Sequence, residues 1–115
     1  MGITLKKIEK WESKKKTKKL LSALNIDDKD VRIGAIRALS NFDTLEVINA
    51  LANLLRDPNP DIRLVAVESL GKIGSPKATE FIRFMLEKET DRYVINAAKY
   101  ALSSIKERSK QEETA

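Results

Sequence analysis

The sequence contains neither cysteine nor histidine, and these two absences narrow the chemistry open to it. Without cysteine the chain can form no disulfide and offers no thiolate to a metal, so nothing in it requires an oxidising compartment. Without histidine it lacks the most common metal ligand and the most common general base. Carboxylates, lysines, tyrosines and hydroxyls remain. We therefore expect a protein that is not an enzyme and that uses no cofactor and no metal.

Glycine, proline and aromatic residues are scarce as well: the 115 residues include 4 glycines and 3 prolines, and 5% are aromatic. Alanine, leucine, lysine and glutamate dominate instead, which favours helices over strands. No apolar run approaches the roughly 20 residues of a membrane span, and the N-terminal residues lack the apolar core of a secretory signal. The length suits one domain. These features predict a single all-α domain that is soluble and cytoplasmic and does not contact a membrane.

The net charge of +5 is concentrated near the N-terminus. Residues 1–25 carry eight lysines and two glutamates, a net charge of +6, whereas the remaining residues sum to −1. We expect four of these lysines to fall partly on one side of a helix, where they could bind nucleic acid or an acidic partner: Lys14, Lys15, Lys18 and Lys19. The alternative is a solvated helix that keeps this end polar, and no aromatic or arginine interleaves with the lysines to stack on bases.

A motif centred on the stretch from Asp57 to Gly74 recurs along the chain. Val31-Arg32-x-x-Ala35-x-x-Ala38-Leu39 returns 31 residues later as Ile62-Arg63-x-x-Ala66-x-x-Ser69-Leu70. A partial third copy follows after 32 more residues, as Val94-x-x-x-Ala98-x-x-Ala101-Leu102. A fixed period of this length is typical of repeat proteins, whose units bury their apolar faces only by stacking on one another.

Residues suited to capping helices recur with the same period. Three acceptor side chains stand three residues before the first aliphatic residue of a helix: Asp28, Asn59 and Asp91. Three hydroxyl side chains, spaced by 31 residues, can cap a second helix in each unit: Ser13, Thr44 and Ser75. Each repeat is therefore predicted to be a helical hairpin.

The repeats predict seven helices, near residues 3–12, 14–24, 29–41, 45–56, 60–72, 76–88 and 92–107. They make up about three and a half repeat units, near residues 1–25, 26–56, 57–88 and 89–108. We expect one domain over residues 1–108, followed by a polar tail over residues 109–115 that frays.

The run Asp57-Pro58-Asn59-Pro60-Asp61-Ile62-Arg63, with Ala66 and Leu70-Gly71-Lys72-Ile73-Gly74, closely resembles HEAT repeats of the phycobilisome-lyase-like type. This resemblance implies a right-handed α-solenoid of helical hairpins, in which the second helix of each hairpin lines a concave face that binds a partner. It further implies that Arg32 and Arg63 pair with aspartates of adjoining repeats and form a ladder along the stack. The third repeat has Ile95 in place of that arginine, as suits a C-terminal cap.

Six residues of the expected concave face are candidates for binding a protein partner: Asn49, Asn53, Arg56, Lys77, Arg83 and Phe84. Phe84 takes a position that is normally solvated, which makes it a candidate apolar anchor. The alternative is a lone exposed aromatic residue without a role. The leading hypothesis is a non-enzymatic scaffold that binds a protein partner as a monomer or weak homodimer. Anion or nucleic-acid binding through the lysines is the alternative function.

The remaining aromatic residues have structural interpretations beside functional ones. Trp11 is in register with Phe42 and Ile73, which predicts a core residue rather than a ligand-stacking site. Tyr93, Ile95 and Tyr100 form either a docking or dimer surface or a cap packed on the preceding repeat. The resemblance also leaves a lyase-type or chromophore-attachment accessory role as the most distant alternative, although no residue here identifies a bilin site.

Overall fold

The computed structural model describes the backbone of residues 2–114 and the side chains of residues 2–113. This part of the chain contains seven α-helices, two short 3-10 helices and no strand. In chain order they are α1 (Leu5–Ser13), α2 (Thr17–Ser22), α3 (Lys29–Leu39), α4 (Leu45–Asn53), η1 (Leu54–Arg56), α5 (Pro60–Ile73), η2 (Pro76–Ala78), α6 (Thr79–Lys88) and α7 (Arg92–Thr114).

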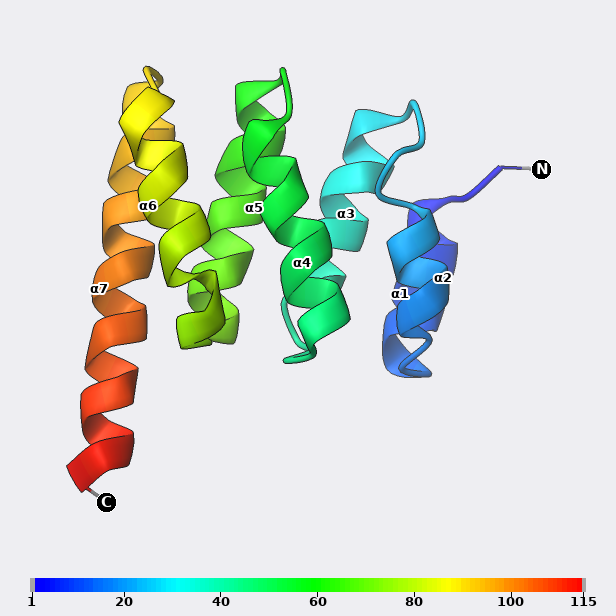
Figure 1. Cartoon of the computed structure of the whole chain (residues 1–115). Coiled ribbons are helices and arrows are strands. Elements are labelled where there is room, and N and C mark those ends of the chain that lie inside the picture. Colours follow the sequence, from blue (N-terminus) through cyan, green and yellow to red (C-terminus); the bar gives the residue numbers. More distant parts are fainter. Residues whose placement is uncertain (1, 115) are drawn as a thin grey trace.

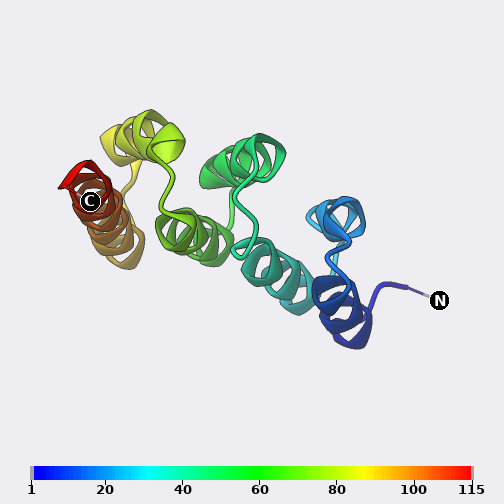
Figure 2. The same cartoon turned by 90° about the horizontal axis from the view of Figure 1, so that it is seen from below.

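The helices stack in two layers (Figures 1 and 2). Helices α1, α3, α5 and α7 form one layer, and α2, α4 and α6 form the other. Successive hairpins lie side by side along the chain, and α7 follows the last hairpin without a second helix after it among the described residues. The predicted all-α solenoid of helical hairpins is confirmed.

The side chains that begin the helices are the predicted ones in all repeats but the first. Asp28 accepts a hydrogen bond from the backbone N–H of Val31, and Thr44 accepts one from Val47. Three further side chains each accept from a backbone N–H two residues later: Asn59 at α5, Asp91 at α7, and Ser75 at the short η2 that leads into α6, which has no side-chain cap of its own. These bonds satisfy donors that the first turn of a helix leaves free.

The prediction for Ser13 is wrong. Ser13 is the last residue of α1, and its hydroxyl donates to the backbone oxygen of Lys10. Helix α2 begins only at Thr17, after Lys16, which forms no side-chain cap. The physical reason lies in the turn between the two helices. The backbone N–H groups of residues 15 and 16 donate to carbonyls of the last turn of α1, so residues 14–16 form the end of α1 and the second helix starts later than the repeat spacing suggests.

Apolar side chains fill the space between the two layers. The apolar side chains of α4 and η1 are buried along the whole segment: Val47, Ile48, Leu51, Leu54 and Leu55. Small residues line the layer of first helices and let their backbones approach closely, and the buried ones are Ala35, Ala38, Ala66, Ala98 and Ala101. Trp11 is half-buried and packs against this core, as predicted, with the Lys19 Nζ 5.7 Å from the centre of its ring.

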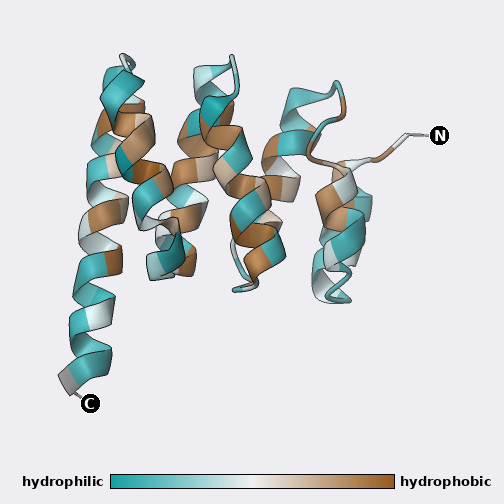
Figure 3. Cartoon of the chain, in the orientation of Figure 1, coloured by the Kyte–Doolittle hydropathy of each residue, from teal (hydrophilic) through white to brown (hydrophobic). Residues whose placement is uncertain are grey.

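Helix α7 is longer than predicted. It runs 23 residues, from Arg92 to Thr114, and projects beyond the ends of its neighbours in Figure 1. The expectation of a helix ending near residue 107 and of a frayed tail is therefore wrong for residues 109–114, and Ala115 lies outside the described residues. The projecting part is mostly hydrophilic (Figure 3). This segment contains no glycine or proline, the residues that commonly end a helix. Its polar composition was therefore not a sufficient reason to predict that the helix stops near residue 107.

Polar contacts tie neighbouring repeats together at both edges of the stack. At one edge Arg32 donates to Asp57 (2.8 Å) and to the backbone oxygen of Leu24 (2.7 Å). At the other edge Asn41 donates to Glu12 (2.6 Å) and accepts from the Lys72 Nζ (3.1 Å). Glu12 lies in α1, Asn41 directly after α3 and Lys72 in α5, so one amide joins three repeats.

The resemblance implied that Arg63 pairs with an aspartate, but in the structure it pairs with Glu89. Its guanidinium donates to both carboxylate oxygens of Glu89, at 2.8 and 3.0 Å, and the Glu89 side chain is 3% exposed. The loops before α5 and α7 have three residues each, and Glu89 stands at the first loop position that Asp57 occupies one repeat earlier. The ladder therefore continues with a different carboxylate.

Both ladder carboxylates are held in their charged forms. The hydrogen bonds from Arg63 lower the pKa of Glu89 below its ordinary value, against the opposing effect of burial. Burial raises the pKa of Asp57, but hydrogen bonds from Arg32 and from the Asn59 N–H outweigh it and leave that pKa lowered. Both ion pairs therefore remain intact at neutral pH.

Candidate partner-binding groove

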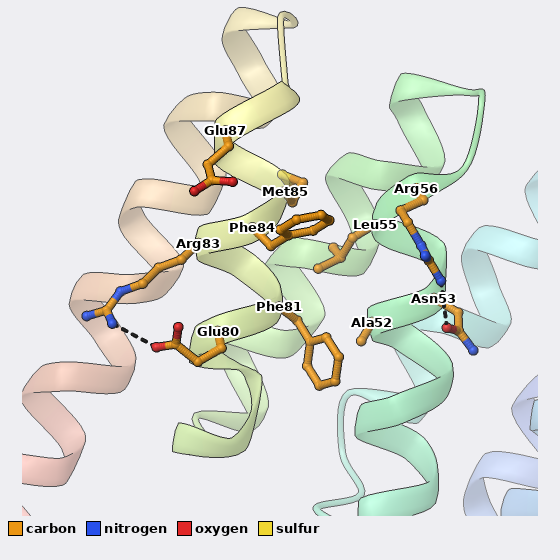
Figure 4. A pocket seen from close by; sticks show the side chains of 10 residues that line it. All are labelled: Ala52, Asn53, Leu55, Arg56, Glu80, Phe81, Arg83, Phe84, Met85 and Glu87. Carbon is orange, nitrogen blue, oxygen red and sulfur yellow. Dashed lines mark hydrogen bonds and ion pairs between the residues drawn. The ribbon is translucent and has the colours of Figure 1, made fainter.

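A groove of about 610 Å³ lies on the second-helix face, between α4 with η1 on one side and α6 on the other. The ten lining residues are drawn in Figure 4: Ala52, Asn53, Leu55, Arg56, Glu80, Phe81, Arg83, Phe84, Met85 and Glu87. Leu55 and Met85 are buried members of the core, so the floor of the groove is continuous with the packed interior. The groove is therefore built on rigid elements rather than on loops.

Two phenylalanines project from α6 into this groove. Phe81 is 46% exposed and Phe84 is 51% exposed, and both rings point toward α4 in Figure 4. They are three residues apart, so they lie on the same face of the helix. Phe84 lies near Leu55, and Phe81 lies below it toward Ala52. Two large apolar side chains left half in water beside each other form an exposed apolar patch, which is typical of a binding surface.

Polar side chains rim the apolar pair. On the α4 side, the guanidinium of Arg56 donates to the Asn53 Oδ1 at 3.3 Å. On the α6 side, Arg83 forms an ion pair with Glu80 at 2.8 Å, and both side chains point away from α4 (Figure 4). Glu87 points the same way. The wall that faces the phenylalanines thus presents a cation and an amide.

The structure brings four of the six predicted partner-binding residues together in this groove, namely Asn53, Arg56, Arg83 and Phe84. Asn49 lies one turn earlier on α4, exposed and outside the lining, and Lys77 lies in η2, also outside it. Sequence reasoning missed Phe81, although its spacing of three residues from Phe84 is the signal that could have revealed it.

A second, smaller hollow of about 380 Å³ adjoins the groove at Phe84. The two hollows share four residues: Leu55, Arg56, Phe84 and Met85. Lys88 lines the smaller hollow, and its Nζ lies 4.7 Å from the centre of the Phe84 ring, within the range of a cation–π contact. The two hollows therefore form one continuous surface with Phe84 at its centre.

The lysine cluster is arranged differently from the sequence-based expectation. Lys18 and Lys19 lie on α2, but Lys14 and Lys15 lie in the turn between α1 and α2, so the four do not share a helix. Lys15 has a φ of 56°, in the left-handed region. All four are exposed, and none of them forms an ion pair within the described residues. The cluster surrounds the turn at the N-terminal end of the stack.

The tyrosines of α7 lie on the layer of first helices. Tyr93 is 68% exposed and Tyr100 is 77% exposed, and they line a shallow hollow of about 750 Å³ between α5 and α7. Ile95 is half-buried and does not line this hollow. A docking surface and a terminal cap are both compatible with this arrangement, and each stays a prediction.

Within residues 2–114 no group of three or more acidic side chains is placed so as to hold a metal ion. None of the helices described is both long and apolar enough to cross a membrane.

Comparisons with known proteins agree with the repeat pattern. A family model described as HEAT repeats matches residues 17–103. The epoxyqueuosine reductase of Bacillus subtilis (strain 168) is 39% identical over 64 residues, which make up 55% of this chain and 17% of the reductase. The match thus spans less than a fifth of that enzyme's length.

Proposed function

The chain belongs to the HEAT-repeat family, and from this premise we propose that it is a non-enzymatic interaction module that binds a segment of a partner protein in the groove between α4 and α6. The observation that carries the proposal is the pair of half-exposed rings, Phe81 and Phe84, over a floor of buried core residues. Removing the exposed part of each ring from water would contribute roughly 1 kcal/mol to binding.

The groove has the composition of a protein-binding site. Such sites combine a central aromatic anchor with a polar rim, and arginine is frequent among the residues that contribute most to binding. Here Phe84 occupies the centre, and Arg56 and Asn53 form part of the rim. The rigid helices on both sides limit the entropy lost when a partner binds.

Affinity purification with three forms of the chain tests this proposal. The first is the unaltered chain, the second carries Phe81→Ala and Phe84→Ala, and the third carries Tyr93→Ala and Tyr100→Ala as a control. The control removes the same number of exposed aromatic rings from the other layer of the solenoid. We expect the phenylalanine variant to lose the partner and the tyrosine variant to keep it. Equal recovery by the two folded variants would refute the proposal.

The N-terminal lysines support a second candidate function, the binding of nucleic acid. The exposed ammonium groups around the turn between α1 and α2 form no ion pair in the described part of the chain and could neutralise several phosphates. Fluorescence anisotropy with a labelled single-stranded RNA and a DNA duplex would test this. We expect affinity that falls steeply with salt and weakens when Lys14, Lys15, Lys18 and Lys19 are changed to glutamine. No binding even at low salt would exclude the role.

A further inference from the structure

Two cations flank Phe84, and neither has a carboxylate partner among the residues that the structure describes. Arg56 donates to the amide oxygen of Asn53 only, at a long 3.3 Å, and Lys88 contacts the ring of Phe84. Neither side chain takes part in an ion pair within the described residues. Arg56 lines both hollows and Lys88 lines the smaller one, so both charges border the surface on which a ligand would lie.

The acidic side chains around the groove are already paired or turned away. Asp57 and Glu89 line the smaller hollow, but Asp57 is paired with Arg32 and Glu89 with Arg63. Glu80 is paired with Arg83 on the side of α6 that faces away from α4 (Figure 4). Glu87 forms no ion pair with any side chain of residues 2–113, but it also points away from α4 (Figure 4). The charge that a ligand meets on either side of Phe84 is therefore positive.

We propose that the groove recognises an acidic peptide segment of a partner, in which carboxylates stand beside an aliphatic or aromatic side chain. The apolar side chain would contact Phe81 and Phe84, and the carboxylates would pair with Arg56 and Lys88. Arginine can hold a carboxylate through two hydrogen bonds, whereas lysine acts as a point charge. This inference rests on the proposed function of the groove and specifies the class of partner.

The arrangement explains why two unpaired cations are found beside an apolar patch. Exposed phenylalanines alone would bind many apolar segments, whereas flanking charges of one sign select among them, because a basic segment would meet repulsion. The charges also speed the encounter with an acidic partner, and this gain falls as salt rises. Affinity and selectivity would thus come from different residues of the same groove.

Selection from a displayed library of random 12-residue peptides on the whole chain tests the inference. We expect the selected peptides to be enriched in aspartate and glutamate next to leucine, isoleucine, phenylalanine or tryptophan. A selected peptide, fluorescently labelled, is then titrated with the unaltered chain and with a variant carrying Arg56→Gln and Lys88→Gln. We expect this variant to bind at least about tenfold more weakly, which matches the loss of two charge-assisted contacts.

A matched control carries Arg37→Gln and Lys99→Gln, which removes one arginine and one lysine from exposed positions on α3 and α7. It should bind as the unaltered chain does, because it changes the net charge equally but leaves the groove intact. Circular dichroism of both variants checks that they remain folded.

The outcomes separate this inference from the proposed function. Peptides that need Phe81 and Phe84 but show no acidic enrichment, or that bind the Arg56 and Lys88 variant unchanged, would overturn the inference and leave the function standing. Peptides that bind the Phe81→Ala and Phe84→Ala variant as tightly as the unaltered chain would overturn both. Failure to select any peptide would likewise refute a peptide-binding groove.

Discussion

Gly71 of α5 lies directly against Ala101 of α7. A Cβ atom placed on Gly71 would come within 2.9 Å of the Ala101 Cβ and 3.1 Å of its Cα. Such distances are shorter than packed carbon atoms tolerate, so the two helices approach as closely as they do only because this side chain is missing. The contact joins the last complete hairpin to the helix that ends the stack.

Gly71→Ala should therefore destabilise the protein, although alanine favours a helix by about 1 kcal/mol over glycine. The methyl group must push the backbone of α7 away, which costs about 1–3 kcal/mol in a packed core. Gly34→Ala is the matched control, because its Cβ would meet the end of the Leu5 side chain, which is 49% exposed and can move. Urea unfolding should show a loss for the first variant and no loss for the second. A gain from Gly71→Ala would contradict the packing argument.

Most of the fold could be predicted from the repeat period. Most units have an acceptor at the start of a helix and small residues where first helices meet, and because both recur every 31 or 32 residues they can be read from the sequence. Prediction failed in the first and the last of the described units. Ser13 matches the period but ends a helix, and Ser109 looks like part of a tail but lies within α7.

The candidate site was predictable only in part. Phe84 stood out because it breaks the repeat pattern, and Arg56 and Asn53 follow from the spacing of α4. The side chains that α6 turns toward α4 depend on how two hairpins sit against each other, which the sequence of either hairpin does not specify. For this reason Phe81 was missed and Lys77 was included. Likewise, Arg63 pairs with Glu89 and not with an aspartate because a glutamate stands at the loop position that Asp57 occupies one repeat earlier.

Glu89→Gln should make stability less dependent on pH. The folded-state pKa of Glu89 is lowered, so its contribution is present above the unfolded pKa of about 4.3 and is lost as pH falls through the folded value. At pH 7 we expect the variant to lose about 2 kcal/mol, since a nearly buried charge-assisted pair is broken. Urea titrations at pH 7 and pH 3 should show this difference shrinking at the lower pH.

The exposed pair of Arg83 and Glu80 provides the control for that experiment. Both side chains are largely in water, so Glu80→Gln should change the free energy of unfolding by less than about 1 kcal/mol at either pH. If Glu89→Gln behaves in the same way as Glu80→Gln, the ladder contributes nothing beyond a surface ion pair.

Lys15→Gly should stabilise the protein. The N–H of Lys16 donates to the Trp11 oxygen (2.8 Å) and the N–H of Lys15 donates to the Glu12 oxygen (3.0 Å), which is the Schellman arrangement that ends many helices. Lys15 occupies its left-handed position, with a φ of 56°, where glycine avoids a steric cost. We expect a gain of about 0.5–1 kcal/mol in thermal or urea unfolding. Lys18→Gly, within α2, should instead cost about 1 kcal/mol.

Arg108→Ala should lower the free energy of unfolding, because this side chain of α7 caps the C-terminal end of the neighbouring α5. Its Nη1 donates to the backbone oxygen of Ile73 at 2.6 Å, where α5 ends and its last carbonyls lack partners within the helix. The guanidinium also lies so close to Gly74 that a Cβ there would collide with it. We expect a loss of about 1–2 kcal/mol.

Lys106→Ala, an exposed change on the same helix, should stay within about 0.5 kcal/mol. If both variants unfold at the same urea concentration, residues beyond 107 add length to α7 but no stability to the fold.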